Sequence, residues 1–302
     1  MKKERDLKFR VLDVVFLLMA ILPLVCGMVL KVLLTPASEG ISITGAMIYF
    51  TIPAPLQDIP ITEAQVNSWF VIITILGLCL YFTHGIRAGV ETRRQLAAEW
   101  VVEKTQSMVR TNMGEDKYFG AFPPFIAAII ALSALSSLTS LLGLNPPTSD
   151  INVVAGWAIM VFILITYYKL KGGLLSYLKG FTEPIFVMTP LNILGEVATP
   201  VSMAFRHYGN VISGSVIAVL IAFALEGLSS LVLGWLPGIL GDIPFLRIGL
   251  PAILSVYFDV FSGCMQAYIF AMLTMLNISG AFPADEYEAR RLKKAQKRKT
   301  AN

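Results

Sequence analysis

Six long apolar runs, each with few charged side chains, constrain the fold of this chain more than any other feature. They cover residues 11–34, 69–86, 120–144, 152–170, 190–235 and 248–277. Each run is long enough to cross a hydrocarbon layer of ~30 Å as a helix. Only 15% of the 302 residues are charged, whereas a soluble domain carries about a quarter. The sequence therefore predicts an all-α membrane protein with six transmembrane helices.

The fifth run is longer than one simple crossing needs, so its helix must be tilted, bent or broken. Pro200, Gly209, Gly214 and Gly227 offer places for a bend. We expect the last two helices to be long and tilted and to pack as an antiparallel hairpin over residues 190–277.

Basic residues are concentrated in segments 1–10, 87–117, 169–180 and 278–302. Every lysine and arginine except Lys31, Arg206 and Arg247 lies in one of these four segments. The positive-inside rule places such segments in the cytoplasm, so both termini are expected there. This placement accounts for the net charge of +4 and requires no nucleic acid partner.

The whole chain, 1–302, is expected to form one integral membrane domain. Residues 1–34 are predicted to be an uncleaved signal anchor, because their apolar region is too long for a cleaved signal peptide. Residues 35–68 are rich in Pro, Ile and Thr and contain no basic residue. They are predicted to form an outer loop.

Residues 88–117 mix apolar and charged side chains at helical spacing. This predicts an amphipathic cytoplasmic helix, on the membrane surface or against a partner. The basic tail 278–302 is expected to lie near anionic lipid headgroups. Three cysteines, Cys26, Cys79 and Cys264, fall in apolar segments and are expected to be small core residues.

Arg206 is isolated in the fifth run, since no other Lys, Arg, Asp or Glu lies between Glu196 and Glu226. A guanidinium at bilayer depth costs ~2.5–3.5 kcal/mol and cannot lose its charge. At 100° per residue, five polar residues fall within about 40° of it: Asn192, Thr199, Ser202, Asn210 and Ser213. Close helix packing accounts for the small residues, but not for the arginine. Arg206 is therefore predicted to meet an anionic group.

A second polar face lies on the sixth run, formed by Ser255, Asp259, Ser262 and Gln266. Asp259 is the only carboxylate between residues 243 and 284. It is interpreted either as a buried partner of Arg206 or as a titratable group in an ion relay. In an antiparallel hairpin, Gln266 is expected near the depth of Arg206, with Asp259 ~10 Å nearer the outside.

These residues belong to a pattern that resembles subunit a of F-type ATP synthases. The run GEVATPVSMAFRHYGNVISG (195–214) is similar to the arginine helix of that family, and GCMQAYIFAMLTM (263–275) to its final helix. LLGLNPPTSDINV (141–153) and YYKLKGGLLSYLKGF (167–181) resemble its middle portion. The similarity covers most of residues 40–280.

The resemblance implies a multi-pass subunit of the bacterial plasma membrane, a stator with two half-channels for H+ or Na+. Its partners would be a ring of c subunits, b-type peripheral stalk subunits and the F1 sector. Carried over from the family, the residues that translocate the ion are Arg206, Asn210, Asp259 and Gln266. Half-channel lining is expected from Ser255 and Ser262 on the outer path, and from Asn192, Glu196, Thr199 and Ser202 on the inner path.

The chain departs from the family pattern at three places. Ser215 stands where many relatives carry a glutamate, so Asp259 is expected to be the main outer carboxylate. Glu226 either serves the outer mouth or pairs with Arg247. His207 replaces an apolar residue and is expected to be structural. The connector 218–250 is long and is expected to form an outer cap.

Two other functions remain open from the residues alone. A secondary transporter of a small anion, with Arg206 as substrate site, fits six spans but lacks an inverted repeat. An intramembrane enzyme is disfavoured because no nucleophile–base pair or metal-ligand cluster is evident. No cofactor is expected, and no P-loop is present, so ATP chemistry would reside on partner subunits.

Overall fold

Six helices in the described part of the chain are long and apolar enough to cross a membrane, which confirms the predicted fold class. The computed structural model describes residues 2–34, 47–55, 57–86, 92–114, 116–182, 185–233, 253–254 and 256–301. The candidate spans are Phe9–Leu34, Glu63–Thr83, Pro123–Leu142, Ile151–Leu170, Phe186–Val232 and Val256–Ala281.

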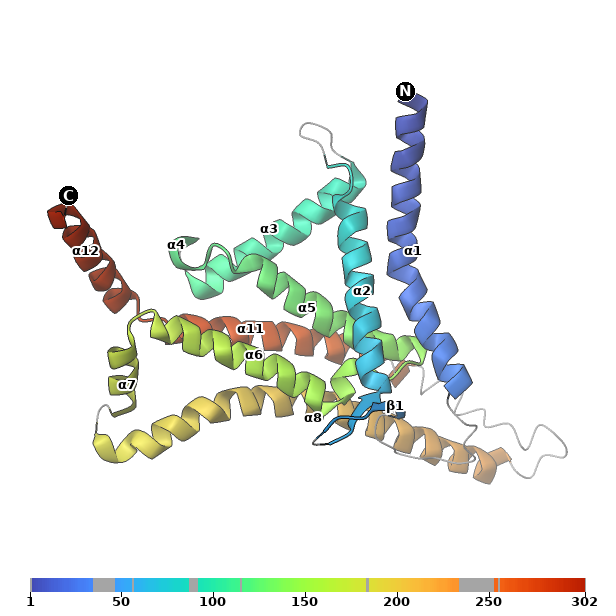
Figure 1. Cartoon of the computed structure of the whole chain (residues 1–302). Coiled ribbons are helices and arrows are strands. Elements are labelled where there is room, and N and C mark those ends of the chain that lie inside the picture. Colours follow the sequence, from blue (N-terminus) through green and yellow to red (C-terminus); the bar gives the residue numbers. More distant parts are fainter. Residues whose placement is uncertain are drawn as a thin grey trace.

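The helices and strands follow one another along the chain as Figure 1 shows. In the first half they are α1 (Lys2–Leu34), β1 (Ile48–Ile52), β2 (Ile59–Thr62), α2 (Glu63–Thr83), α3 (Arg93–Met113), α4 (Asp116–Phe119), α5 (Pro123–Leu138) and the 3-10 turns η1 (Thr139–Leu142) and η2 (Pro147–Ser149). In the second half they are α6 (Ile151–Leu170), α7 (Leu174–Thr182), η3 (Phe186–Met188), α8 (Thr189–Leu233), the π-helix η4 (Val256–Ser262), α11 (Gly263–Ala281) and α12 (Ala284–Ala301).

The first two spans, α1 and α2, lie side by side (Figure 1). Gly77 on α2 permits this contact, because a Cβ atom there would lie 2.6 Å from the backbone nitrogen of Ala20. Small residues allow such close approach in membrane helices. The remaining surface of α1 is largely exposed and apolar, as expected of a helix in contact with lipid.

The cysteines correct one expectation. Cys26, Cys79 and Cys264 are all exposed on their helices rather than buried in the core. Lipid-facing and core-facing positions of a span are equally apolar, so hydropathy does not distinguish them.

The predicted outer loop contains an antiparallel hairpin of β1 and β2, and α2 begins earlier than the apolar run suggests. Thr62 caps α2 by accepting a hydrogen bond from the Gln65 amide, which sets the helix start. Glu63 is 1% exposed and lies 3.3 Å from the Lys31 ammonium, while Asn145 donates to it at 2.7 Å. The buried carboxylate therefore ties α2 to α1 and to the α5–α6 connection. Residues 35–46 lie outside the described residues.

The buried core is built mainly by α5, α6 and α11, which cross the direction of α1 and α2 (Figure 1). Ile126, Val161, Phe270 and Met275 are at most 1% exposed. The end of α3 joins this core through Val109 and Met113, whereas Leu96 and Trp100 near its start are exposed.

The fifth span, α8, is one continuous helix of 45 residues despite Pro200 within it. It arches across the direction of α1 and α2 (Figure 1). Residues 218–233 of the expected connector continue α8, while 234–250 lie outside the described residues. The two termini lie on the side opposite to the β-hairpin (Figure 1).

Contacts between α8 and the last span establish the predicted antiparallel packing. Asn210 bonds to Ser262, and the Asn277 amide donates to the sulfur of Met203. From Met203 to Asn210 the residue number rises along α8, while the number of the contacted residue falls from 277 to 262 on the last span. The two helices are therefore antiparallel. Residues 248–252 and 255 of the predicted last span lie outside the described residues.

Replacing Gly77 by valine should force α1 away from α2, since the added side chain meets backbone atoms of Ala20. Overpacking of this kind costs about 1–3 kcal/mol, so the thermal unfolding temperature of the purified assembly should fall. Gly156→Ala is the control, because no atom of the described residues lies within 4 Å of a Cβ at that position. Equal unfolding temperatures for Gly77→Val and wild type would contradict the proposed packing.

Candidate functional site

Arg206 occupies an exposed position on α8, next to Phe205, which is 60% exposed. Among the described residues, no carboxylate forms an ion pair with its guanidinium. Asp259 is thus not a buried ion-pair partner of Arg206 in this structure. The guanidinium instead lies on the exposed surface of α8, where a molecule that packs against this helix would contact it.

The polar residues that share the face of Arg206 differ in what they contact. Thr199 and Ser213 each donate to a backbone carbonyl of α8, at 3.1 and 3.2 Å. Ser215, on the opposite face of the helix, does the same at 2.8 Å. Such bonds satisfy a hydroxyl inside an apolar layer. Ser202 is exposed on the same helix.

Asn210 connects α8 to the last span through a reciprocal pair of hydrogen bonds. Its amide nitrogen lies 2.9 Å from Ser262 Oγ, and that hydroxyl lies 3.1 Å from Asn210 Oδ1. Arg206 is one turn before Asn210, and Gln266 is one turn after Ser262. The antiparallel register therefore brings Gln266 close to the depth of Arg206, as the sequence predicts.

Asp259 lies in η4, a π-helical segment that the sequence did not predict. It faces a recess of about 20 Å³ whose walls come mainly from α5, η1, α8 and the last span. The residues that line the recess include Ser137, Ser140, Asn210, Gly214, Ser215 and Asp259. A space of this size holds about one water molecule. The structure thus brings Asp259, Asn210 and Ser215 together.

Helix α5 and the following turn η1 contribute hydroxyls to this region that the sequence analysis missed. Ser137 and Ser140 line the recess, and the Ser140 side chain interacts with the Asp259 carboxylate. Gly263 lets the last span approach α5, because a Cβ there would lie 2.5 Å from that of Ser137. The sequence does contain a signal for these hydroxyls, since serines recur at helical spacing on one face, at Ser133, Ser136, Ser137 and Ser140.

His207 is fully buried between helices, which fits the structural role expected for it. Its ring packs edge-on against Trp157 and Phe270, with centroids 5.8 and 5.6 Å apart. Its Nε2 lies 3.4 Å from the hydroxyl of Ser133. The imidazole therefore fills the space between α5, α6, α8 and α11.

Gln266 is buried, at 5% exposed, and its Nε2 has no hydrogen-bond partner among the described residues. A buried amide without a partner costs ~1–3 kcal/mol. Gln266 is thus the one buried residue among the four predicted for translocation, and the described part of the chain offers its Nε2 no hydrogen-bond partner.

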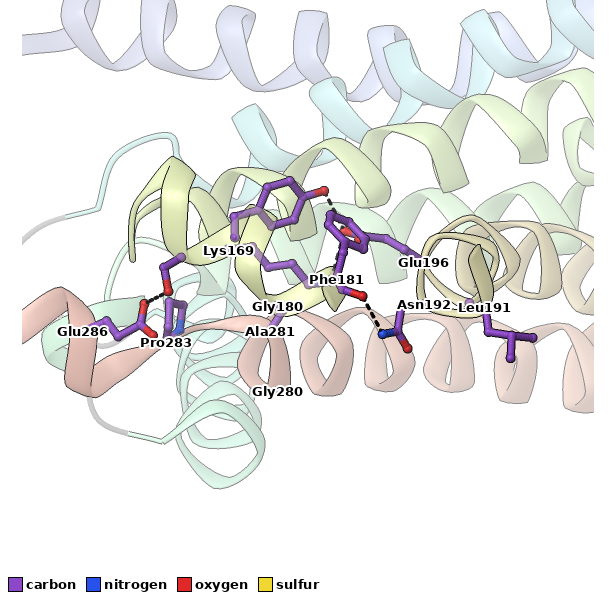
Figure 2. Close-up of a pocket in the computed structure, with 13 residues that line it drawn as sticks. Lys169, Gly180, Phe181, Leu191, Asn192, Glu196, Gly280, Ala281, Pro283 and Glu286 are labelled. Carbon is purple, nitrogen blue, oxygen red and sulfur yellow. Dashed lines mark hydrogen bonds and ion pairs between the residues drawn. The ribbon is translucent and has the colours of Figure 1, made fainter. Parts of the chain in front are cut away.

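A larger cavity, of about 480 Å³, lies at the other end of the region, where α8 begins. Figure 2 shows its walls, formed by the end of α6, by α7, by the start of α8 and by the α11–α12 junction. Two residues expected on the inner path, Asn192 and Glu196, line it. Asn192 donates to the carbonyl of Phe181 at 2.9 Å, which joins α8 to α7 (Figure 2).

Glu196 is held in this cavity by two residues that the sequence analysis did not select. The Lys169 ammonium lies 3.0 Å from its Oε1, and the hydroxyl of Tyr177 donates to the same oxygen at 3.2 Å. The Glu196 side chain is only 7% exposed, so Lys169 compensates a buried charge. Burial, and then the charge of Glu196, raise the pKa of the Tyr177 phenol, which therefore stays a hydrogen-bond donor.

The other predicted lining residues that the structure describes are not part of either space. Thr199 and Ser202 do not line the cavity, although they share its helix. Glu226 is half-buried on α8, and Ser255 and Arg247 lie outside the described residues.

Comparison with known proteins gives a consistent set of relatives. The family model of the ATP synthase A chain matches residues 65–279. "ATP synthase subunit a 1" of Chlorobaculum parvum is 30% identical over 224 residues, 72% of this chain and 86% of that protein. "ATP synthase subunit a" of Anoxybacillus flavithermus is 31% identical over 71% of this chain and 94% of its own. "ATP synthase subunit a, sodium ion specific" of Propionigenium modestum is 26% identical over 83% and 88%.

The six spans and these bacterial relatives define a multi-pass bacterial membrane protein whose longest helix carries an exposed arginine. More specifically, the chain belongs to the ATP synthase A chain family.

Lys169→Ala should destabilise the protein, because it leaves the buried Glu196 carboxylate without its cation. We expect a loss on the order of 1–3 kcal/mol, less than for a fully buried pair because Lys169 is partly exposed. The double variant Lys169→Ala/Glu196→Gln should recover most of the thermal stability, since it removes both charges. Equal unfolding temperatures for the single and double variants would contradict this account.

Proposed function

We propose that this chain is the ion-translocating stator subunit of the membrane sector of an ATP synthase. The observation that carries the proposal is the exposed guanidinium of Arg206, without an ion-pair partner among the described residues, on the longest span. A cation at membrane depth requires an anionic partner, and a carboxylate on a neighbouring c-subunit ring would supply it.

Arg206 would act on that ring carboxylate electrostatically. An opposite charge nearby favours the ionised form and lowers the pKa of a carboxyl group, so a carboxylate that reaches Arg206 releases its ion. The fixed positive charge also repels H+ or Na+ and prevents a direct leak between the two sides. At a membrane potential of ~150 mV, each ion contributes ~3.5 kcal/mol to rotation.

The outer half-channel is proposed to run through the recess at Asp259. There the carboxylate, Ser215 and the Asn210–Ser262 pair provide polar groups at one place between three helices. Because Ser215 cannot ionise, Asp259 would be the main group that binds and releases the ion on this side. Ser255 and Glu226 are the candidates for the outer mouth, and Gln266 for the inner end near Arg206.

The inner half-channel is proposed to end in the 480 Å³ cavity. Asn192 and Glu196 line that cavity, and Thr199 and Ser202 would continue the polar face of α8 from it toward Arg206. The partners of this stator are proposed to be the c-ring, b-type peripheral stalk subunits and the F1 sector, where ATP chemistry would occur.

Arg206→Ala should abolish ATP-driven ion uptake into vesicles that contain the assembled complex, because the ring carboxylate loses its counter-charge. Arg291→Ala, which removes an exposed arginine from α12, serves as the control and should pump normally. Co-purification of the c-ring and F1 would verify assembly. Normal pumping by an assembled Arg206→Ala complex would refute the central role of Arg206.

The same preparation separates this proposal from an anion transporter. A stator co-purifies with a c-ring and moves ions only in its company, whereas a transporter takes up solute as an isolated chain. Saturable anion uptake by the chain alone would favour the second function.

Asp259→Asn should slow ATP-driven uptake by on the order of tenfold to a hundredfold, because an amide cannot bind and release a proton and is a weaker cation ligand. Asp58→Asn is the matched control, since Asp58 is an exposed carboxylate on the outer hairpin. Equal rates for the two variants would exclude Asp259 from the outer path.

A further inference from the structure

The inner cavity contains a second carboxylate, Glu286, which lies in the first turn of α12 rather than on a transmembrane span. Glu286 differs from Glu196, the other carboxylate of the cavity, in whether a basic residue forms an ion pair with it. Glu196 is paired with Lys169, while no basic residue forms an ion pair with Glu286 in the described part of the chain. Glu286 is therefore the carboxylate of the cavity without a direct ion-pair partner among the described residues.

Glu286 is held at the wall of the cavity by α7. The hydroxyl of Ser176 donates to its Oε2, and Figure 2 shows this bond beside Pro283. The carboxylate also lies against Gly172 at the α6–α7 turn, where its Oε2 would be 3.0 Å from an added Cβ. A carboxyl oxygen accepts such a hydrogen bond.

The start of α12 is itself fixed, so Glu286 does not belong to a free tail. The Tyr118 hydroxyl donates to Glu288, and its ring lies 6.1 Å from that of Tyr287. Arg290 packs against Gly173, whose φ of +123° favours glycine. These contacts keep the first turn of α12 against α4 and the α6–α7 turn.

We propose that Glu286 is the cation-passing carboxylate at the cytoplasmic mouth of the inner half-channel. This inference rests on the proposed function and adds to it a residue from α12. A carboxylate oxygen binds H+ reversibly, and it is also a ligand for Na+. In either case the ion enters from the cavity, is held on a Glu286 oxygen and leaves to water, with no other bond changed. The negative charge also concentrates cations at the mouth.

The test is passive ion conduction by the membrane sector in vesicles stripped of F1. Glu286→Gln keeps the size of the side chain and removes its charge. Conduction should fall by on the order of tenfold, the lower end of what electrostatic focusing in a cleft provides. The matched control is Asp285→Asn, because Asp285 is an exposed neighbour that does not line the cavity.

The outcomes separate this inference from the proposed function. Wild-type rates for Glu286→Gln, or an equal loss in Asp285→Asn, would overturn the role of Glu286 and leave the stator proposal intact. Absence of conduction in the wild-type membrane sector, by contrast, would count against the stator proposal itself.

A labelling experiment distinguishes charge from structure. Glu286→Cys, assembled first and then modified, should regain conduction with a thiol reagent that carries a carboxylate and not with a neutral reagent of similar size. Wild type treated in the same way measures the contribution of the exposed Cys26, Cys79 and Cys264. Equal recovery with both reagents would mean that bulk, rather than charge, is required, and would refute the proposal. This variant also decides the question if Glu286→Gln fails to assemble.

Discussion

The register between α8 and the last span is the constraint on which the rest of the site depends. It is fixed in the middle by the reciprocal hydrogen bonds of Asn210 and Ser262. One turn away along each helix lie Arg206 and Gln266. A shift of the last span by one residue would move Asp259 out of the position in which it lines its recess. A hydrogen-bonded polar pair in an apolar layer resists such a shift, because either partner alone would remain unsatisfied.

The fold and the central residues could be predicted from sequence because the membrane imposes simple patterns. Span number followed from apolar runs, and the shared face of Arg206 and Asn210 followed from helical spacing. The depth of Gln266 followed from assuming an antiparallel hairpin. Each of these inferences used only periodicity and the cost of burying charge.

Other features depend on contacts between segments that are distant in the sequence, and the periodicity of the sequence does not reveal such contacts. The π-helix at Asp259 has no evident sequence signal. Lys169 was counted only as a cytoplasmic charge, and Glu286 only as part of a tail, yet both line one cavity. The exposed cysteines show the same limit, since an apolar residue on a span faces either lipid or protein. Only the serines of α5 and η1 carried a pattern that could have been used.

The two polar spaces along α8 differ greatly in size, about 480 Å³ at the start of the helix and about 20 Å³ near Asn210. If they are the ends of one ion path, they act as two resistances in series. The wide cavity admits an ion with its water shell and stays near the potential of the solution it joins. The narrow recess then takes most of the voltage drop, so the membrane field is focused across the few residues around Asp259. A charge that moves through the recess would therefore cross nearly the whole membrane potential. Selection among ions would occur there as well, because an ion must lose its hydration shell to enter.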